Sequence, residues 1–308
     1  MRVACLFFPE NHDQLKHQIE HVLTDKEISV RFSCVKNEYI NLIKEYDNII
    51  TWGLKVPKEW YDKHGKNFLF IENALFNQGS GIFLDTNGWF SDSTICTDKE
   101  YLQSASSFEI DKFYEIAEER FGWVDYFQEY DPEGPILVVL QRENDAPVKY
   151  CYDDYGKGSS ILSLLSRVKK QFPDKEIIVR PHPRHRSDWE EVREEGVKIF
   201  GDRWELDLEK SVYRSISRCS KVITINSTVA TEALFSGIPV ATIGRSAYTG
   251  SGATYEGKLS GFDDFTPDRE VVKNYLGAIM RHQLMIDSSC EDILNNECFS
   301  RWMSNGLS

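Results

Sequence analysis

The stretch "KVITINSTVATEALFSGIPVATIG" (residues 221–244) decides the fold. An apolar strand pattern at 221–227 leads into a helical pattern at 228–237, and a second strand pattern follows at 239–244. Strand, helix and strand in close succession are typical of a parallel sheet, because a crossover helix returns the chain to the start of the next parallel strand. This stretch therefore predicts a Rossmann-like sheet in the second half of the chain.

The same alternation extends upstream through the second half. "ILVVLQ" (136–141) is an uninterrupted apolar run, which is typical of a strand buried on both faces. Between it and the first stretch lie a helical pattern at 158–171, the strand pattern "EIIVRPHP" (176–183) and the helical pattern "DLEKSVYRSISRC" (207–219). We therefore expect one complete doubly wound domain here.

The first half of the chain repeats this organisation. Strand patterns alternate with helical ones and occupy residues 2–8, 28–35, 48–53 and 67–73. The turn "DPEGP" (131–135) separates the halves, and two domains suit the length of the chain. We expect an α/β protein of two Rossmann-like doubly wound domains that face a central cleft. Their bounds are 1–130 and 131–270, and a helical tail at 271–308 packs back on the first domain.

The composition argues against several classes of protein. The 308 residues are 41% hydrophobic, enough to bury a core, but they contain no continuous apolar run of about 18 residues. The seven cysteines are scattered without metal-ligand spacing, which disfavours a disulfide framework or a zinc site. A formal net charge of −13 disfavours a general nucleic-acid surface. We expect a cytoplasmic protein with no transmembrane segment.

Four polar segments follow strand patterns in the second half. Because the carboxyl ends of parallel strands meet at one edge of a sheet, we expect these segments to face one ligand-binding crevice. Ser227 and Thr228 stand at a strand-to-helix junction, where hydroxyls and free amides bind phosphate, and Glu232 can reach a ribose diol. Alternatively, Ser227 and Thr228 are ordinary helix caps, and Glu232 is a solvated helix residue. The segments are "LQRENDAP" (140–147), "RPHPRHR" (180–186), "INSTVATEAL" (225–234) and "GRSAYTGSGATY" (244–255).

The "RPHPRHR" segment concentrates positive charge in an acidic chain. Two prolines fix the backbone around His182, whose ring can donate to a phosphoryl oxygen. Arg180, Arg184 and Arg186 can oppose phosphate charge. A simple turn with solvated side chains is the alternative. There is no GxGxxG motif and no Walker lysine, so neither a nicotinamide nor an ATP fingerprint is present.

Taken together, these segments resemble the nucleotide-binding half of the capsule-polysaccharide biosynthesis glycosyltransferases, a group that includes the bacterial β-Kdo transferases. The order and spacing of the family's motif residues match over roughly residues 135–255. The first half is similar in "ITWGLKVP" (50–57) and "FIENALFNQGSGIFLDTNGWFSD" (70–92), although Glu72-Asn73-Ala74 replaces the family's Glu-Asp-Gly and its Arg-Ser is missing. The matching residues of the second half are Gln141, Asp145, Arg180, His182, Asn226, Ser227, Thr228 and Glu232.

The resemblance implies a two-domain GT-B-like fold. The second half would bind a nucleotide-sugar co-substrate through the eight motif residues, and the first half would bind the acceptor. Glu72 is the first choice for the catalytic base and Asp85 the second, although both could be surface carboxylates beside turns. His182 would assist the leaving phosphate. Because the sequence lacks an Asp-x-Asp motif, we expect no metal, and we expect no further cofactor.

Several functions stay open at this point. A glycan or lipid-linked acceptor is the leading choice for a glycosyltransferase. A phage-type enzyme acting on a hydroxymethylated DNA base would keep the donor half and change the first half, but residues 1–125 carry net negative charge. A nucleotide-sugar epimerase would instead place acid and base residues around the sugar. A non-catalytic nucleotide-sugar-binding protein would tolerate replacement of Glu72 and His182.

Overall fold

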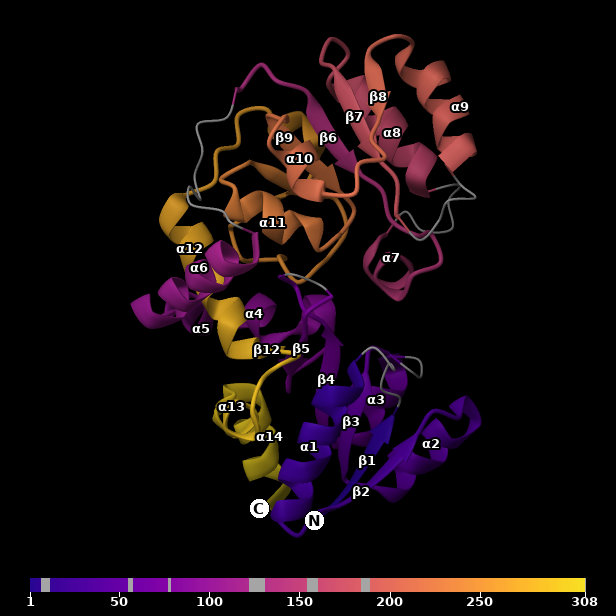
Figure 1. Cartoon of the computed structure of the whole chain (residues 1–308). Coiled ribbons are helices and arrows are strands. Elements are labelled where there is room, and N and C mark those ends of the chain that lie inside the picture. The colour runs from indigo at the N-terminus through magenta and orange to yellow at the C-terminus, as the bar shows by residue number, and fades with distance from the viewer. Residues whose placement is uncertain are drawn as a thin grey trace.

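The computed structural model describes residues 1–6, 12–54, 58–76, 79–121, 131–153, 160–183 and 189–307. The chain forms two lobes, each built on a six-stranded sheet (Figure 1). The predicted fold class, two Rossmann-like α/β domains that face a cleft, is confirmed. Arg184, Arg186 and residues 122–130, which precede the predicted boundary turn, lie outside the described residues.

The first lobe contains a mixed sheet in the order β12-β5-β4-β3-β1-β2. The four strands β1 to β4 are parallel, whereas β5 is antiparallel to β4 and to β12. The strands are β1 (Arg2–Leu6), β2 (Ser29–Ser33), β3 (Asn48–Trp52), β4 (Asn67–Asn73), β5 (Gly81–Asp85) and β12 (Gln283–Met285). The helices beside them are α1 (Asp13–Asp25), α2 (Lys36–Glu45), α3 (Lys58–His64), α13 (Cys290–Asn295) and α14 (Glu297–Leu307).

The second lobe contains an all-parallel sheet in the order β11-β10-β9-β6-β7-β8. The chain reverses its winding direction between β6 and β9, and doubly wound sheets bind ligands at such a switch point. The strands are β6 (Ile136–Val139), β7 (Ile177–Arg180), β8 (Trp204–Leu206), β9 (Lys221–Thr224), β10 (Val240–Thr242) and β11 (Tyr255–Glu256). The helices are α7 (Ala146–Cys151), α8 (Ser160–Gln171), α9 (Trp189–Phe200), α10 (Val212–Ile216) and α11 (Val229–Phe235).

Four helices lie between the sheets: α4 (Thr94–Thr97), α5 (Lys99–Gln103), α6 (Ser107–Phe121) and α12 (Arg269–His282). Helix α12 runs beside α6 and leads the chain back to the first lobe, where β12 pairs with β5 (Figure 1). Helix α14 then buries Trp302 against the first sheet, and the two termini lie near each other.

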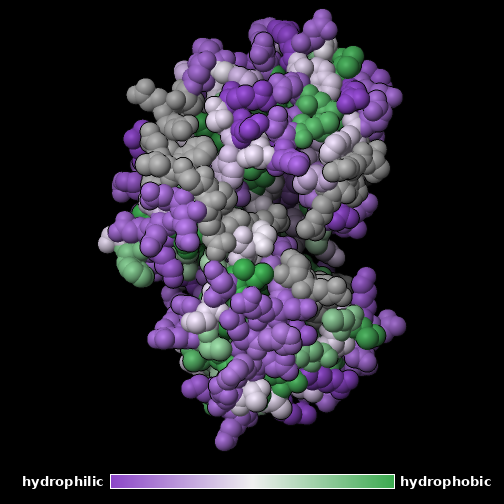
Figure 2. Space-filling model, viewed as in Figure 1, coloured by the Kyte–Doolittle hydropathy of each residue, from purple (hydrophilic) through white to green (hydrophobic). Residues whose placement is uncertain are grey.

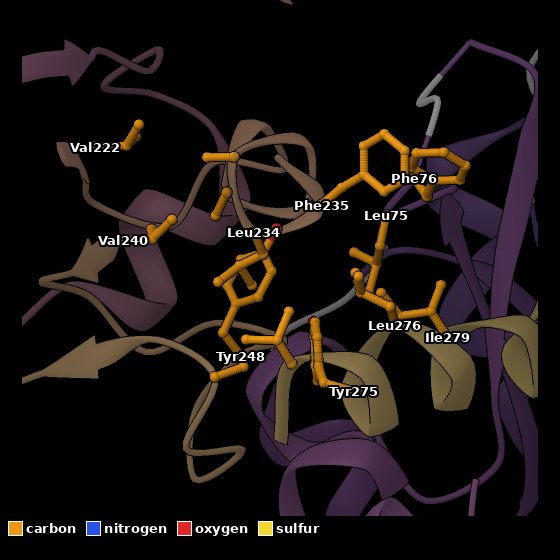
Figure 3. Close-up of a cluster of buried hydrophobic side chains, with 14 of the residues drawn as sticks. Leu75, Phe76, Val222, Leu234, Phe235, Val240, Tyr248, Tyr275, Leu276 and Ile279 are labelled. Atoms are coloured by element: carbon orange, nitrogen blue, oxygen red, sulfur yellow. The ribbon is translucent and has the colours of Figure 1, made fainter. Parts of the chain in front are cut away.

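One hydrophobic core joins the two lobes. The ring of Phe76, which follows β4, lies 4.2 Å from that of Phe113 on α6 and 5.9 Å from that of Phe235 on α11. Leu276 and Ile279 of α12 belong to the same buried cluster (Figure 3). Because residues of both lobes fill this core, the two sheets cannot separate without exposing it.

The surface offers no further indication of function on the side that Figure 2 shows. This face is mostly hydrophilic, and its apolar residues occur in small groups. No helix within the described ranges combines the length and the apolar character needed to cross a membrane.

The shared core predicts that the lobes unfold together. Replacing fully buried Phe235 with alanine should lower the free energy of unfolding by about 3–5 kcal/mol, because the cavity opens where both lobes meet. Urea denaturation followed by circular dichroism measures this loss, and we expect one transition. Val197→Ala, at an exposed position on α9, is the control and should change stability by less than about 0.5 kcal/mol. Two separate transitions, or a loss below about 1 kcal/mol for Phe235→Ala, would contradict the shared core.

Candidate active site between the lobes

A cleft of about 500 Å³ lies between the lobes, at the carboxyl ends of strands from both sheets. The first lobe contributes aromatic side chains and one carboxylate, and the second lobe contributes mostly polar side chains. This division places two chemically different walls opposite each other. The lining residues used below are Trp52, Gly53, Glu72, Asn73, Trp89 and Phe90 of the first lobe, and Gln141, Arg142, Asp145, His182, Asn226, Ser227 and Thr228 of the second.

Gln141 and Asn226 form a brace across the switch point of the second sheet. Gln141 Nε2 donates to Asn226 Oδ1 at 2.6 Å, and the Asn226 backbone N–H donates to Gln141 Oε1 at 2.7 Å. The Asn226 Nδ2 group donates to the carbonyls of Pro147 and Arg245. Both predicted residues therefore line the cleft, but their polar atoms fix the ends of β6 and β9 to each other.

Ser227 and Thr228 lie between this brace and α11. Both are half-buried and line the cleft, as the sequence predicted. The Ser227 hydroxyl accepts a hydrogen bond from the Val229 N–H at 3.3 Å, so it caps the first turn. Helix α11 has only seven residues, and its dipole is correspondingly small. The hydroxyl groups are thus the main donors that this segment offers to an anion.

Arg142 brings a positive charge into the cleft, although it was not among the predicted site residues. Its Nε atom is buried and has no hydrogen-bond partner among the described residues. Its nearest anionic partner is Asp145, at 3.6 Å from NH1 to Oδ1. Asp145 itself precedes α7 and lines the cleft as predicted. A partly exposed guanidinium whose ion pair with the described residues is this long is suited to bind a phosphate.

The structure differs from the expectation for Arg180. Its guanidinium donates to the Asp207 carboxylate at 2.8 Å, to the Ser215 hydroxyl at 3.1 Å and to the carbonyl of Glu209. Arg180 is not among the described residues that line the cleft. Burial alone would raise the pKa of Asp207. Hydrogen bonds from Ser215 and from the Glu209 backbone N–H, together with the positive charge of Arg180, lower that pKa below its ordinary value. Arg180 therefore stabilises the second lobe rather than a ligand.

The same buried aspartate explains why α10 is shorter than predicted. The sequence pattern indicated a helix over 207–219, whereas α10 covers Val212–Ile216. Asp207 is 2% exposed and accepts hydrogen bonds from Ser215 and from the Glu209 N–H, so the chain turns around its carboxylate before the helix begins.

His182 and Glu232 occupy different surroundings. His182 lines the cleft after β7, and its carbonyl accepts a bond from the Trp189 indole at 3.4 Å. Glu232 is 7% exposed on α11 and is not among the described residues that line the cleft. Burial raises the pKa of Tyr213, and the negative charge of Glu232 raises it further. A ribose contact by Glu232 stays a prediction.

Glu72 presents a carboxylate to the cleft from the end of β4. Its Oε1 atom accepts bonds from the backbone N–H and the side-chain Nδ2 of Asn73, at 2.9 and 3.1 Å. Its Oε2 atom accepts a bond from Trp89 Nε1 at 3.3 Å. Gly53, at the end of β3, has φ +59°, and a Cβ there would lie 3.2 Å from Glu72 Oε2. The Trp-Gly strand end thus makes room for this carboxylate.

Asp85, the second choice for the base, is buried instead of catalytic. It is 1% exposed and accepts bonds from the backbone N–H groups of Asn87, Gly88 and Thr94. His282 Nδ1 lies 3.2 Å from Asp85 Oδ2. Burial would lower the pKa of His282, but Cys298 and Asp85 raise it to about 10. Asp85 therefore fixes the turn after β5 and connects it to α12, and the prediction of a base at this residue is wrong.

Among the described residues, no group of three or more histidine, cysteine, aspartate or glutamate side chains could hold a metal ion. The groups in the cleft that can bind an anion are the Arg142 guanidinium, the hydroxyls of Ser227 and Thr228, and the His182 imidazole.

Two Rossmann-like lobes with a polar cleft at their carboxyl edges define a protein of the GT-B-like class. Residues 98–288, more than half of the chain, match the family of capsule polysaccharide biosynthesis proteins. The chain belongs to this family. The predicted resemblance is thereby confirmed.

Individual relatives are more distant. The chain is 25% identical over 158 residues to the capsule polysaccharide export protein KpsS of Escherichia coli, and the match covers 47% of this chain and 39% of that protein. The chain therefore spans less than half of that relative. The structure of Thermosulfurimonas dismutans KpsC, β-Kdo 2,7 transferase, is 18% identical with a TM-score of 0.60 and covers 96% of this chain and 99% of that chain. This likeness shows the shared two-lobed fold.

The two arginines predict opposite effects of substitution. Arg142→Ala should weaken nucleotide binding by at least about tenfold, because it removes a charge-assisted contact in the cleft, and should leave stability nearly unchanged. Arg180→Ala should cost about 3–5 kcal/mol of stability by leaving Asp207 buried without its cation. Isothermal titration calorimetry with whichever of CMP, UDP or GDP binds best, together with urea denaturation, separates the two effects. Tight binding by Arg142→Ala and weak binding by a stable Arg180→Ala would reverse the assignment.

Proposed function

We propose that the chain is a glycosyltransferase that moves a sugar from a nucleotide-sugar donor to a hydroxyl of a glycan or lipid-linked acceptor. One observation carries the proposal: the cleft places the Glu72 carboxylate on one wall and Arg142, His182 and Ser227 on the other. Sugar transfer needs a base for the acceptor hydroxyl and fixed donors for the leaving phosphate, and these groups are divided between the two lobes in that way.

The second lobe is proposed to bind the donor. Its cleft residues lie at the switch point between β6 and β9, where doubly wound sheets bind nucleotides. Arg142 opposes the phosphate charge, and the hydroxyls of Ser227 and Thr228 donate to phosphate oxygens. His182 donates a further bond as the sugar–phosphate bond breaks. In this proposal protein groups alone stabilise the leaving phosphate, and no metal is needed.

The first lobe is proposed to bind the acceptor. Glu72 accepts the proton of the acceptor hydroxyl while that oxygen attacks the anomeric carbon, and the bonding electrons of the broken bond leave with the phosphate. Asn73 and Trp89 hold the carboxylate at the end of β4 through three hydrogen bonds. A fixed carboxylate is an effective base because it does not have to reorient during the reaction.

Family membership supports a glycan or a lipid-linked glycan as the acceptor rather than DNA. The formal net charge of −13 also gives no support to a surface that grips a phosphate backbone. The KpsC structure with TM-score 0.60 is named a β-Kdo transferase, so a CMP-activated Kdo donor is the first to assay.

Substitution of Glu72 tests the proposed reaction. Glu72→Gln keeps the shape of the side chain but cannot take a proton, so kcat should fall by at least about 100-fold while nucleotide affinity changes little. Release of the nucleotide from donor in the presence of acceptor measures this effect. Glu59→Gln, at an exposed carboxylate of α3, is the matched control. Full turnover by the Glu72→Gln chain would exclude Glu72 as the base.

His182 provides a second test on the opposite wall. His182→Ala should abolish transfer while the fold stays intact, because the change removes a phosphate donor from a surface cleft. Circular dichroism and urea denaturation verify the fold. Turnover like that of the unsubstituted chain would remove His182 from the donor site.

A further inference from the structure

We propose that Trp89 is a positioning residue for the reaction: its indole N–H orients the Glu72 carboxylate and keeps it ionised. This inference rests on the proposed function, because it assigns Trp89 a role through the proposed base. Trp89 lies within the segment 70–92 that resembles the family, but it was not among the predicted site residues. In the sequence it belongs to an aromatic segment, "GWFSD" (88–92), which is also consistent with ordinary core packing.

Trp89 contacts the Glu72 carboxylate directly. Trp89 is 5% exposed, and its Nε1 donates to Glu72 Oε2 at 3.3 Å. The other carboxylate oxygen, Oε1, is held by Asn73. Among the described residues, the end of β4 and the segment after β5 both bind the carboxylate. Without the Trp89 N–H, the Oε2 atom of Glu72 loses the hydrogen bond that orients it.

The segment after β5 is built to hold Trp89 in this place. Asp85 binds three backbone N–H groups of the turn, as described above, and thus fixes both ends of residues 86–94. A Cβ on Gly88 would lie 2.5 Å from the Asp92 carbonyl oxygen, so the turn is too tight for another residue. Phe90 has φ +57°, a conformation that a side chain disfavours. Surrounding contacts must maintain this backbone.

The second lobe supplies some of those contacts. The Cys96 Sγ lies 3.3 Å from the Ser246 carbonyl oxygen and 3.6 Å from the Phe90 carbonyl oxygen, so its single S–H can donate to either. The Phe90 ring stacks on that of Trp89, with centroids 5.2 Å apart and planes at 30°. Residues 86–96 therefore join the proposed base to the junction of the lobes. The bond from Trp89 to the proposed base therefore depends on the order of this segment.

A hydrogen bond to an ionised carboxylate stabilises the charged form, so loss of the donor must raise the pKa of Glu72. Trp89→Phe keeps an aromatic ring and removes the N–H. We expect the Glu72 pKa to rise by roughly half a unit or more. We also expect the acid limb of the kcat/KM profile to move to higher pH by the same amount, because the base is active only when deprotonated.

The decisive experiment measures the Glu72 pKa by carbon-13 NMR on chains labelled at the glutamate carboxyl carbon. Glu72→Gln assigns the resonance. Trp302→Phe is the matched control, because it removes an indole N–H bond to the Asn67 carbonyl in the same lobe, away from the cleft. We expect a raised Glu72 pKa only in Trp89→Phe. A Glu72 pKa equal to that of the unsubstituted chain would overturn the inference.

Further experiments distinguish failure of this inference from failure of the proposed function. If Trp89→Phe does not fold, benzothienylalanine can be incorporated at residue 89, because it removes the N–H with almost no change in shape. The same titration of Glu72 then shows whether loss of the N–H raises the pKa. If Glu72→Gln retains full transfer activity, the proposed base fails, whereas the titration still shows whether Trp89 binds the carboxylate. A raised pKa together with an unmoved pH–rate profile would overturn the positioning role.

Discussion

The contact between Phe76, Phe113 and Phe235 is the constraint on which the rest of the structure depends. These rings belong to one buried cluster that includes residues of both lobes and of α12 (Figure 3). A cleft whose base lies on one lobe and whose phosphate donors lie on the other works only if the two walls keep their separation. Burial of this cluster fixes that separation, because parting the lobes would expose large aromatic side chains to water.

Buried polar groups then set the shape of each wall. Gln141 and Asn226 tie together two strand ends at the switch point, and Asp85 ties the turn after β5 to α12. These groups are almost completely bonded within the protein, which is what burial of polar atoms requires. Several residues that a motif comparison assigns to a ligand thus act on the cleft by holding its walls. Arg142 also lines the cleft, and its only ion pair among the described residues is the 3.6 Å contact with Asp145.

The sheets could be predicted from the sequence because strand and helix periodicities are local. "ILVVLQ" and "KVITINS" indicated the central strands β6 and β9. The short strands β8, β11 and β12 could not be predicted, because their two or three residues each are defined by pairing with distant strands. The cleft was predicted from the strand ends and includes Glu72, His182, Ser227 and Thr228. The sequence did not distinguish Arg142 from Arg180, because the direction of the Arg180 guanidinium depends on Asp207, an acceptor 27 residues away along the chain.

In the proposed function, the second lobe binds the phosphate and the first lobe removes the proton from the acceptor hydroxyl. A thermal-shift panel with CMP, UDP, GDP, TDP and ADP tests the central claim, nucleotide binding in the cleft, most directly. A nucleotide that binds the folded chain raises its Tm by mass action. The account predicts a clear rise with one nucleotide, and loss of that rise in the Arg142→Ala chain. No rise with any of the five nucleotides would contradict a nucleotide-sugar site between the lobes.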